Sequence, residues 1–164
     1  KDFGMKQGLI AAFIALLADQ ASKIATLAYF ADRVPPVKVT SFFNYVLAWN
    51  RGVSFSMFHS DKPLAPVVLT VVALMICGIV FYWMKNEKDV KTQICFGLIL
   101  GGAIGNIIDR IRFGAVIDFL DFYVGTYHWP AFNVADSAIC VGAGYILIWN
   151  LFFAPIEKPK GLGK

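Results

Sequence analysis

Charge is scarce in this chain of 164 residues: only 16% of them are charged, whereas 58% are hydrophobic. A soluble domain of this length would carry about a quarter charged residues. The hydrophobic residues gather in runs close to the roughly 17–25 residues that span a bilayer. These runs cover residues 8–27, 64–84, 92–108 and 135–153. A soluble bundle would show polar stripes along its helices, so the composition instead predicts an integral membrane protein.

Cysteine and histidine are also rare. The three cysteines, Cys77, Cys95 and Cys140, lie in the predicted spans and lack the spacing of a disulfide framework or a zinc site. The two histidines, His59 and His128, are far apart. Ser-x-x-Lys, GxSxG and Cys/His combinations are missing. We therefore expect no metal site and no cofactor, and we find no familiar serine or cysteine nucleophile.

Lysine is concentrated in segments that would share one side of the membrane if the chain crosses it four times. Positively charged segments stay in the cytoplasm, so we expect both termini inside and residues 28–63 and 111–135 outside. The net charge of +4 reflects this flanking and requires no nucleic-acid partner. The flanking residues are Lys1, Lys6, Lys85, Lys88, Lys91, Lys158, Lys160 and Lys164.

The first outer connection is too long for a simple turn. Pro35 and Pro36 end helical structure, and the aromatic and β-branched run at residues 42–49 favours a strand. We expect residues 34–60 to hold a small antiparallel sheet and then, at 52–58, a short amphipathic helix. This segment could line a substrate groove or anchor the chain at the membrane surface. The predicted fold class is therefore membrane all-α with a small β element.

Acidic residues inside or beside the apolar runs are the main functional signal. A carboxylate in hydrocarbon costs several kcal/mol unless it is paired, hydrated or protonated, so such residues usually serve a function. The predicted topology places most of them at the outer membrane face, where water could reach a hydrolytic site. These residues are Asp19, Asp109, Asp118, Asp121 and Asp136.

Two facing carboxylates can share one proton and activate a water molecule between them. Asp118 has apolar neighbours, which raise a carboxyl pKa, whereas Asp109 is followed by Arg110 and suits a structural ion pair. We therefore favour Asp118 with Asp136 as the catalytic pair, and the sequence leaves open which of them holds the proton. We expect Asp121 to be a solvated loop residue.

Two further patterns concern helix packing. Asp19 and Lys23 are four residues apart on one helical face, so they can form an ion pair that is structural or orients groups near the active site. The glycines at residues 97, 101 and 105 form GxxxG motifs, which let another helix approach closely. Such packing would hold Asn106 and Asp109 against a neighbouring helix.

Motifs along nearly the whole chain, taken in order, resemble those of bacterial lipoprotein signal peptidase, or signal peptidase II. The resemblance implies an aspartyl endopeptidase of the bacterial inner membrane that acts on prolipoproteins, cutting before a cysteine that carries diacylglycerol. It also implies contact with membrane lipids and inhibition by cyclic depsipeptides such as globomycin. The motifs are DQASK at 19–23, WNRGVSFS at 49–56, GGAIGNIIDR at 101–110, VIDF at 116–119 and PAFNVADSAI at 130–139.

The resemblance also assigns roles to residues. The family's catalytic aspartates correspond to Asp118 and Asp136. We expect Asn50 to engage an extended substrate backbone or to shape a turn, with Gly52 small enough to let a substrate approach. The family often has NTGAAF where this chain has NRGVSF, which leaves the shape of this loop open. The other supporting residues are Asp19, Lys23, Asn106, Asp109, Arg110 and Asn133.

Two other functions compete with the peptidase. A small proton-coupled carrier would use the aspartates as a relay, but its acidic groups would be staggered across the membrane, and such carriers usually contain a repeat. A non-catalytic scaffold would explain the glycine motifs but would give the carboxylates no purpose.

Overall fold

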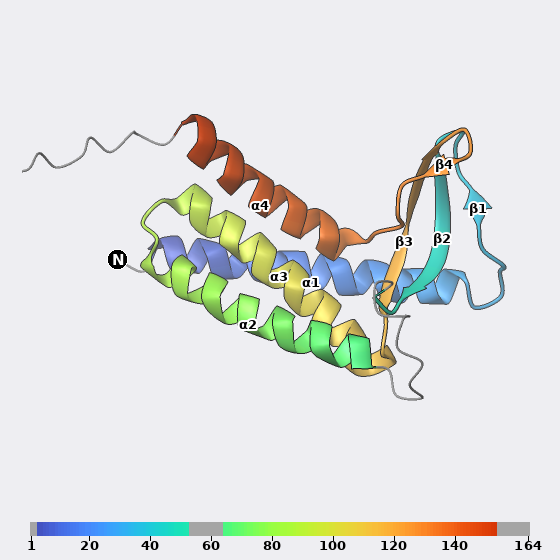
Figure 1. The fold of residues 1–164 in the computed structure, drawn as a ribbon, viewed down its shortest axis with the longest axis horizontal. Coiled ribbons are helices and arrows are strands. Elements are labelled where there is room, and N and C mark those ends of the chain that lie inside the picture. The colour runs from blue at the N-terminus through green and yellow to red at the C-terminus, as the bar shows by residue number, and fades with distance from the viewer. Residues whose placement is uncertain (1–2, 53–63, 154–164) are drawn as a thin grey trace, which may run out of the picture.

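Four long helices lie side by side in the computed structural model, which describes residues 3–52 and 64–153 (Figure 1). Each helix is long and apolar enough to cross a membrane, which confirms the four predicted spans. Their bounds extend the predicted ones by a few residues at most ends. The helices are α1 (Phe3–Tyr29), α2 (Leu64–Asn86), α3 (Val90–Phe113) and α4 (Val134–Phe152).

Helix α3 is the centre of the bundle and packs against α1, α2 and α4. Its glycines make this possible. A methyl group on Gly97 would overlap the carbonyl oxygen of Gly8, and one on Gly101 would overlap that of Ala12. The GxxxG motifs therefore bring the backbones of α1 and α3 into direct contact, as predicted.

The outer faces of the helices are apolar. Phe13 on α1, Met75 on α2 and Leu151 on α4 are each more than half exposed. Side chains of this kind would aggregate a soluble protein but suit the hydrocarbon of a bilayer. This surface excludes the soluble bundle and agrees with a multi-pass membrane protein.

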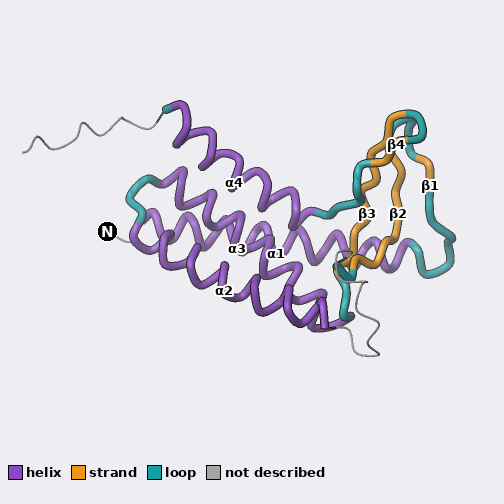
Figure 2. Tube along the Cα trace, viewed as in Figure 1, coloured by secondary structure: helices purple, strands orange, loops and turns teal. Residues whose placement is uncertain are grey.

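A four-stranded antiparallel sheet, in the order β1-β2-β3-β4, stands across one end of the bundle (Figures 1 and 2). The strand predicted at residues 42–49 is confirmed as β2. Its long partner, β3, comes from the second outer connection, where we predicted no strand. The strands are β1 (Val37–Lys38), β2 (Phe43–Asn50), β3 (Val116–Val124) and β4 (Tyr127–His128).

The sheet end of the bundle holds the end of α1, the end of α3 and the start of α4 (Figure 1). The opposite end holds the start of α1 and the loop between α2 and α3. The amphipathic helix predicted at residues 52–58 lies, apart from Gly52, outside the described residues. The acidic residues of α1, α3 and α4 lie towards the sheet end of these helices, so the acidic motifs meet where the sheet joins the bundle.

Candidate active site

Most of the predicted site residues come together at the junction of α1, α3, β3 and α4. They form one continuous hydrogen-bonded network, although they are spread over most of the sequence. Asp19 and Lys23 come from α1, Asn106 and Asp109 from α3, Asp118 from β3, and Asn133 and Asp136 from the start of α4.

Asn133 links the two predicted catalytic aspartates. Its side-chain Nδ2 donates to Asp118 Oδ1 at 2.8 Å, and its backbone N–H donates to Asp136 Oδ2 at 3.2 Å. Its side-chain Oδ1 accepts the backbone N–H of Asp136, so that Asn133 is also the N-cap of α4. This capping box fixes the start of the helix and the position of Asp136 together.

Asp118 is 2% exposed and each of its carboxylate oxygens accepts a side-chain amide. Asn133 donates to one oxygen, and Asn50 Nδ2 donates to the other at 3.1 Å. Burial raises the pKa of Asp118 to about 6; the hydrogen bond from Asn50 opposes this shift, and the charge of Asp136 adds to it. The apolar neighbours that suggested a raised pKa are the buried Val116, Ile117 and Phe119.

Asn50 reaches Asp118 because β2 and β3 are paired, with Asn50 opposite Val116 and Ala48 opposite Asp118. Its Oδ1 accepts the backbone N–H of Gly52 at 3.0 Å, so Asn50 also shapes the turn that follows β2. Gly52 has φ of 86°, a conformation that favours glycine. The side-chain amide of Asn50 thus contacts the candidate dyad directly.

Asp136 is partly exposed, unlike Asp118. Its Oδ1 accepts the side-chain Nδ2 of Asn106 at 2.9 Å, and its Oδ2 accepts from the backbone of Asn133. It also lies in the first turn of α4, where the positive end of the helix dipole favours a negative charge. Asp136 is therefore the more accessible carboxylate of the two, and two N–H donors hold it in place.

A buried ion-pair cluster lies beneath the two aspartates. Lys23 is 2% exposed, and its Nζ lies 2.9 Å from Asp19 Oδ2 and 2.7 Å from Asp109 Oδ2. The predicted pairing of Asp19 with Lys23 is confirmed. The ion-pair partner of Asp109 is Lys23 on the neighbouring helix, whereas among the described residues Arg110 makes no ion pair.

Asp19 and Asp109 also accept backbone N–H groups from other elements. Asp19 Oδ1 accepts the N–H of Ala135 at 2.9 Å, in the first turn of α4. Asp109 Oδ2 accepts the N–H of Ile117 at 3.1 Å, immediately before Asp118. The cluster therefore positions the two segments that carry the dyad.

Gln20 belongs to the site and was missed as a site residue. Its Nε2 lies within 3.2 Å of Asp19 Oδ2, Asp109 Oδ1 and the carbonyl oxygen of Gly105. A glutamine between Asp19 and Lys23 in an otherwise apolar run was the available signal.

The prediction for Asp121 was wrong, because it is a buried strand residue and not a solvated loop residue. It is 8% exposed, accepts Asn44 Nδ2 at 2.8 Å and lies 2.8 Å from His128 Nδ1. Burial acts to raise the pKa of Asp121, but the hydrogen bonds from His128 and Asn44 outweigh it and lower that pKa. Asp121 therefore joins β2, β3 and β4, away from the dyad.

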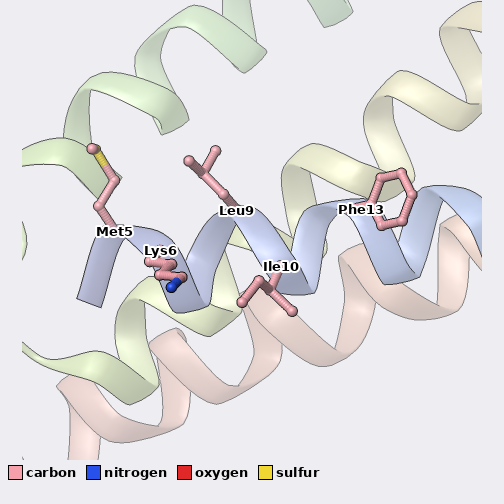
Figure 3. Close-up of a pocket in the computed structure, with 5 residues that line it drawn as sticks. All are labelled: Met5, Lys6, Leu9, Ile10 and Phe13. Carbon is pink, nitrogen blue, oxygen red and sulfur yellow. The ribbon is translucent and has the colours of Figure 1, made fainter. Parts of the chain in front are cut away.

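A surface hollow of about 430 Å³ lies far from this network, along the N-terminal part of α1 (Figure 3). Its side chains are apolar except for one lysine, and we assign it no chemistry. Over residues 3–52 and 64–153, no group of three His, Cys, Asp or Glu side chains is arranged to hold a metal ion. The hollow is lined by Met5, Lys6, Leu9, Ile10 and Phe13.

Comparison with known proteins gives consistent matches. A family model described as Signal peptidase (SPase) II matches residues 11–153. A lipoprotein signal peptidase of Nitrobacter hamburgensis is 40% identical over 159 residues, covering 94% of this chain and 97% of that protein. A lipoprotein signal peptidase of Polynucleobacter necessarius is 41% identical over 166 aligned positions, covering 100% and 96% of the two chains.

A solved structure shares the fold. It is described as a bacterial membrane enzyme determined by the in meso method at 1.9 Å resolution, and it superposes with a TM-score of 0.75. It is 24% identical in sequence, and the match covers 90% of this chain and 94% of that one. Given the family match over most of its length, the chain belongs to the signal peptidase II family.

Proposed function

We propose that this protein is an aspartic endopeptidase that removes signal peptides from prolipoproteins, cutting on the N-terminal side of a cysteine that carries diacylglycerol. The relatives named lipoprotein signal peptidase support the substrate class. The observation that carries the aspartic mechanism is the link from Asp118 through Asn133 to Asp136. These two carboxylates would form the catalytic dyad.

The two aspartates have different environments, which suggests different roles. Asp118 is buried and has a pKa raised to about 6, so it favours the protonated form more than an ordinary carboxyl. Asp136 is partly exposed, so a water molecule can reach it, and it accepts two N–H groups at a helix N-terminus. We therefore assign the shared proton to Asp118 and the role of general base to Asp136.

In the first step, the ionised Asp136 takes a proton from a water molecule while the water oxygen bonds to the scissile carbonyl carbon. Asp118 gives its proton to the carbonyl oxygen, and a neutral gem-diol results. Asp136 then returns a proton to the amide nitrogen as the carbon–nitrogen bond breaks. Asp118 recovers its proton from one hydroxyl of the gem-diol, leaving a carboxylic acid and a free amine.

The charge distribution supports an orientation in the membrane. Lys6, Lys85, Lys88 and Lys91 lie at the end of the bundle opposite the sheet. Placing that end in the cytoplasm of a bacterium follows the positive-inside rule. The dyad would then lie near the extracytoplasmic face of the inner membrane, with both termini inside.

The mechanism and topology also suggest how the protein meets its partners. The lipid chains of the substrate would remain in the bilayer beside the apolar outer faces of the helices, while the peptide reaches Asp136 from the membrane surface. We expect cyclic depsipeptides such as globomycin to compete for the same site.

A cleavage assay tests the proposal. Purified protein in detergent is incubated with a prolipoprotein whose cysteine does or does not carry diacylglycerol, and product masses are measured. We expect cleavage of the modified substrate alone, at the bond before the cysteine, at a rate that a metal chelator leaves unchanged. Absence of cleavage, cleavage elsewhere or equal cleavage of both substrates would contradict the proposed activity.

A further inference from the structure

All three protons of the Lys23 ammonium group have an acceptor. Two go to Asp19 Oδ2 and Asp109 Oδ2, and the third goes to Asn106 Oδ1 at 3.0 Å. The side chain is 2% exposed, so water does not compete for these contacts. The Lys23 side chain therefore spends its full donor capacity on these three oxygens.

The third contact fixes the orientation of the Asn106 amide. An ammonium group only donates hydrogen bonds, so only the amide oxygen of Asn106 can face it. Asn133 Nδ2 donates to the same oxygen at 3.2 Å. The NH₂ group of Asn106 must therefore point the other way, where it donates to Asp136 Oδ1 at 2.9 Å.

We propose that Lys23 is a positioning residue for peptide hydrolysis, which acts through Asn106 to keep a hydrogen-bond donor on the general base Asp136. The idea rests on the proposed peptidase function. Lys23 does not touch substrate, and with all of its protons engaged it is no proton donor or acceptor in the reaction. Lys23 affects Asp136 only through the side-chain amide of Asn106.

Lys23 does not pair with either aspartate of the dyad, although its charge orients the amide that contacts Asp136. Asp19 and Asp109 neutralise the ammonium group locally, and Asp118 and Asp136 bind amide donors and not the cation. A direct ion pair would hold a catalytic carboxylate in its ionised form throughout the cycle. An oriented amide stabilises the base and still allows it to accept a proton.

The effect of Lys23 on catalysis can be measured apart from its contribution to folding. Lys23→Met alone would leave two buried carboxylates without a cation, and such a protein can fail to fold. In an Asp109→Asn background, Lys23→Met removes one positive charge where one negative charge is already gone, so the cluster keeps its wild-type net charge. The effect of Lys23→Met is therefore measured in the Asp109→Asn background.

The experiment is a double-mutant cycle between Lys23 and Asn106 in that background. Turnover of a diacylglyceryl-modified prolipoprotein is measured in detergent, together with melting temperature. We expect Lys23→Met to lower kcat at least about tenfold with KM little changed. In the presence of Asn106→Ala, Lys23→Met should lower kcat no further than about twofold. Equal losses in both cases, or no loss of kcat, would overturn the positioning role.

A control and a second variant complete the test. Thr26→Val changes another buried polar residue of α1, which contacts Tyr45 and not Asn106, and it should leave kcat unchanged. Asn106→Asp keeps an oxygen for Lys23, so it tests the donor to Asp136 even if the Lys23 variants do not fold. We expect Asn106→Asp to be folded and at least about a hundredfold slower.

Failure of the inference about Lys23 can be told apart from failure of the proposed peptidase function. If wild-type protein does not cleave the substrate, the peptidase proposal itself is contradicted. If wild type cleaves and Asn106→Asp turns over at the wild-type rate, the inference about Lys23 and Asn106 is overturned while the peptidase proposal stands.

Discussion

The side-chain nitrogen of Asn133 lies 2.8 Å from Oδ1 of Asp118, and this contact joins the start of α4 to strand β3. Asn133 is completely buried. Its oxygen is occupied by the backbone N–H of Asp136, so its nitrogen is the part that faces Asp118. One residue thereby serves as both a helix cap and a link between two carboxylates.

These two roles of Asn133 can be separated by substitution. Serine is a good N-cap but carries no amide to reach Asp118, whereas alanine lacks both functions. We expect Asn133→Ser and Asn133→Ala to lose turnover to a similar extent, about a hundredfold. Alanine should additionally cost about 1 kcal/mol of stability relative to serine. A serine variant with wild-type turnover would show that the contact with Asp118 is dispensable.

Removal of the Asn50 amide should shift the pH dependence. Its hydrogen bond favours the ionised form of Asp118 and so lowers a pKa that burial raises to about 6. In Asn50→Ala that pKa should rise above 6. Asp118 acts as the acid in our mechanism, so the limb where activity falls with increasing pH should move to higher pH.

The matched control for Asn50 is Asn44→Ala. Asn44 lies on the same strand and donates to Asp121, away from the dyad. Profiles of kcat/KM between about pH 5 and 9 distinguish the two. A shift of this limb to lower pH in Asn50→Ala, or an equal shift in Asn44→Ala, would contradict the assignment.

Loss of the Asp109 charge should destabilise the protein. Asp109 is 1% exposed and pairs with Lys23, so Asp109→Asn weakens a buried ion pair and a contact to the backbone of β3. Lys23 keeps its pairing with Asp19 in this variant, so we expect a loss of about 1–3 kcal/mol of stability from the buried contacts that are left unmade, with lower activity. Asp89→Asn, at the exposed N-cap of α3, should leave the melting temperature unchanged because asparagine caps equally well. A fully stable but inactive Asp109→Asn protein would point to a direct catalytic role.

Helix packing gives an independent stability prediction. A methyl group on Gly101 would overlap the backbone of Ala12, whereas one on Gly78 meets nothing within 4 Å. Gly101→Ala should therefore cost about 1–3 kcal/mol through overpacking, and Gly78→Ala should be neutral or slightly stabilising. Thermal unfolding in detergent compares them. Equal melting temperatures would show that the approach of α1 to α3 does not depend on this glycine.

The parts of the fold that could be predicted from sequence depend on local patterns. The four spans follow from the length of apolar runs, and the pairing of Asp19 with Lys23 follows from helical spacing. The raised pKa of Asp118 follows from its apolar neighbours in the chain. In each case the deciding residues lie within one continuous segment of the chain.

The parts that could not be predicted depend on contacts between distant segments. β3 pairs with β2, from the other outer connection, and only this pairing brings Asn50 to Asp118. The β-branched and aromatic residues of β3 were a local signal for a strand, and they would have corrected the interpretation of Asp121. The pairing of Lys23 with Asp109 requires the packing of α1 on α3, which no single segment specifies.

The catalytic dyad is tested most directly by turnover of a diacylglyceryl-modified prolipoprotein by Asp118→Asn and Asp136→Asn, with melting temperature measured on the same samples. Each change keeps the size of the side chain but prevents it from sharing a proton. We expect both variants to fold and to lose at least about a thousandfold in kcat. Substantial turnover by either folded variant would contradict the assignment of Asp118 and Asp136 as the catalytic dyad.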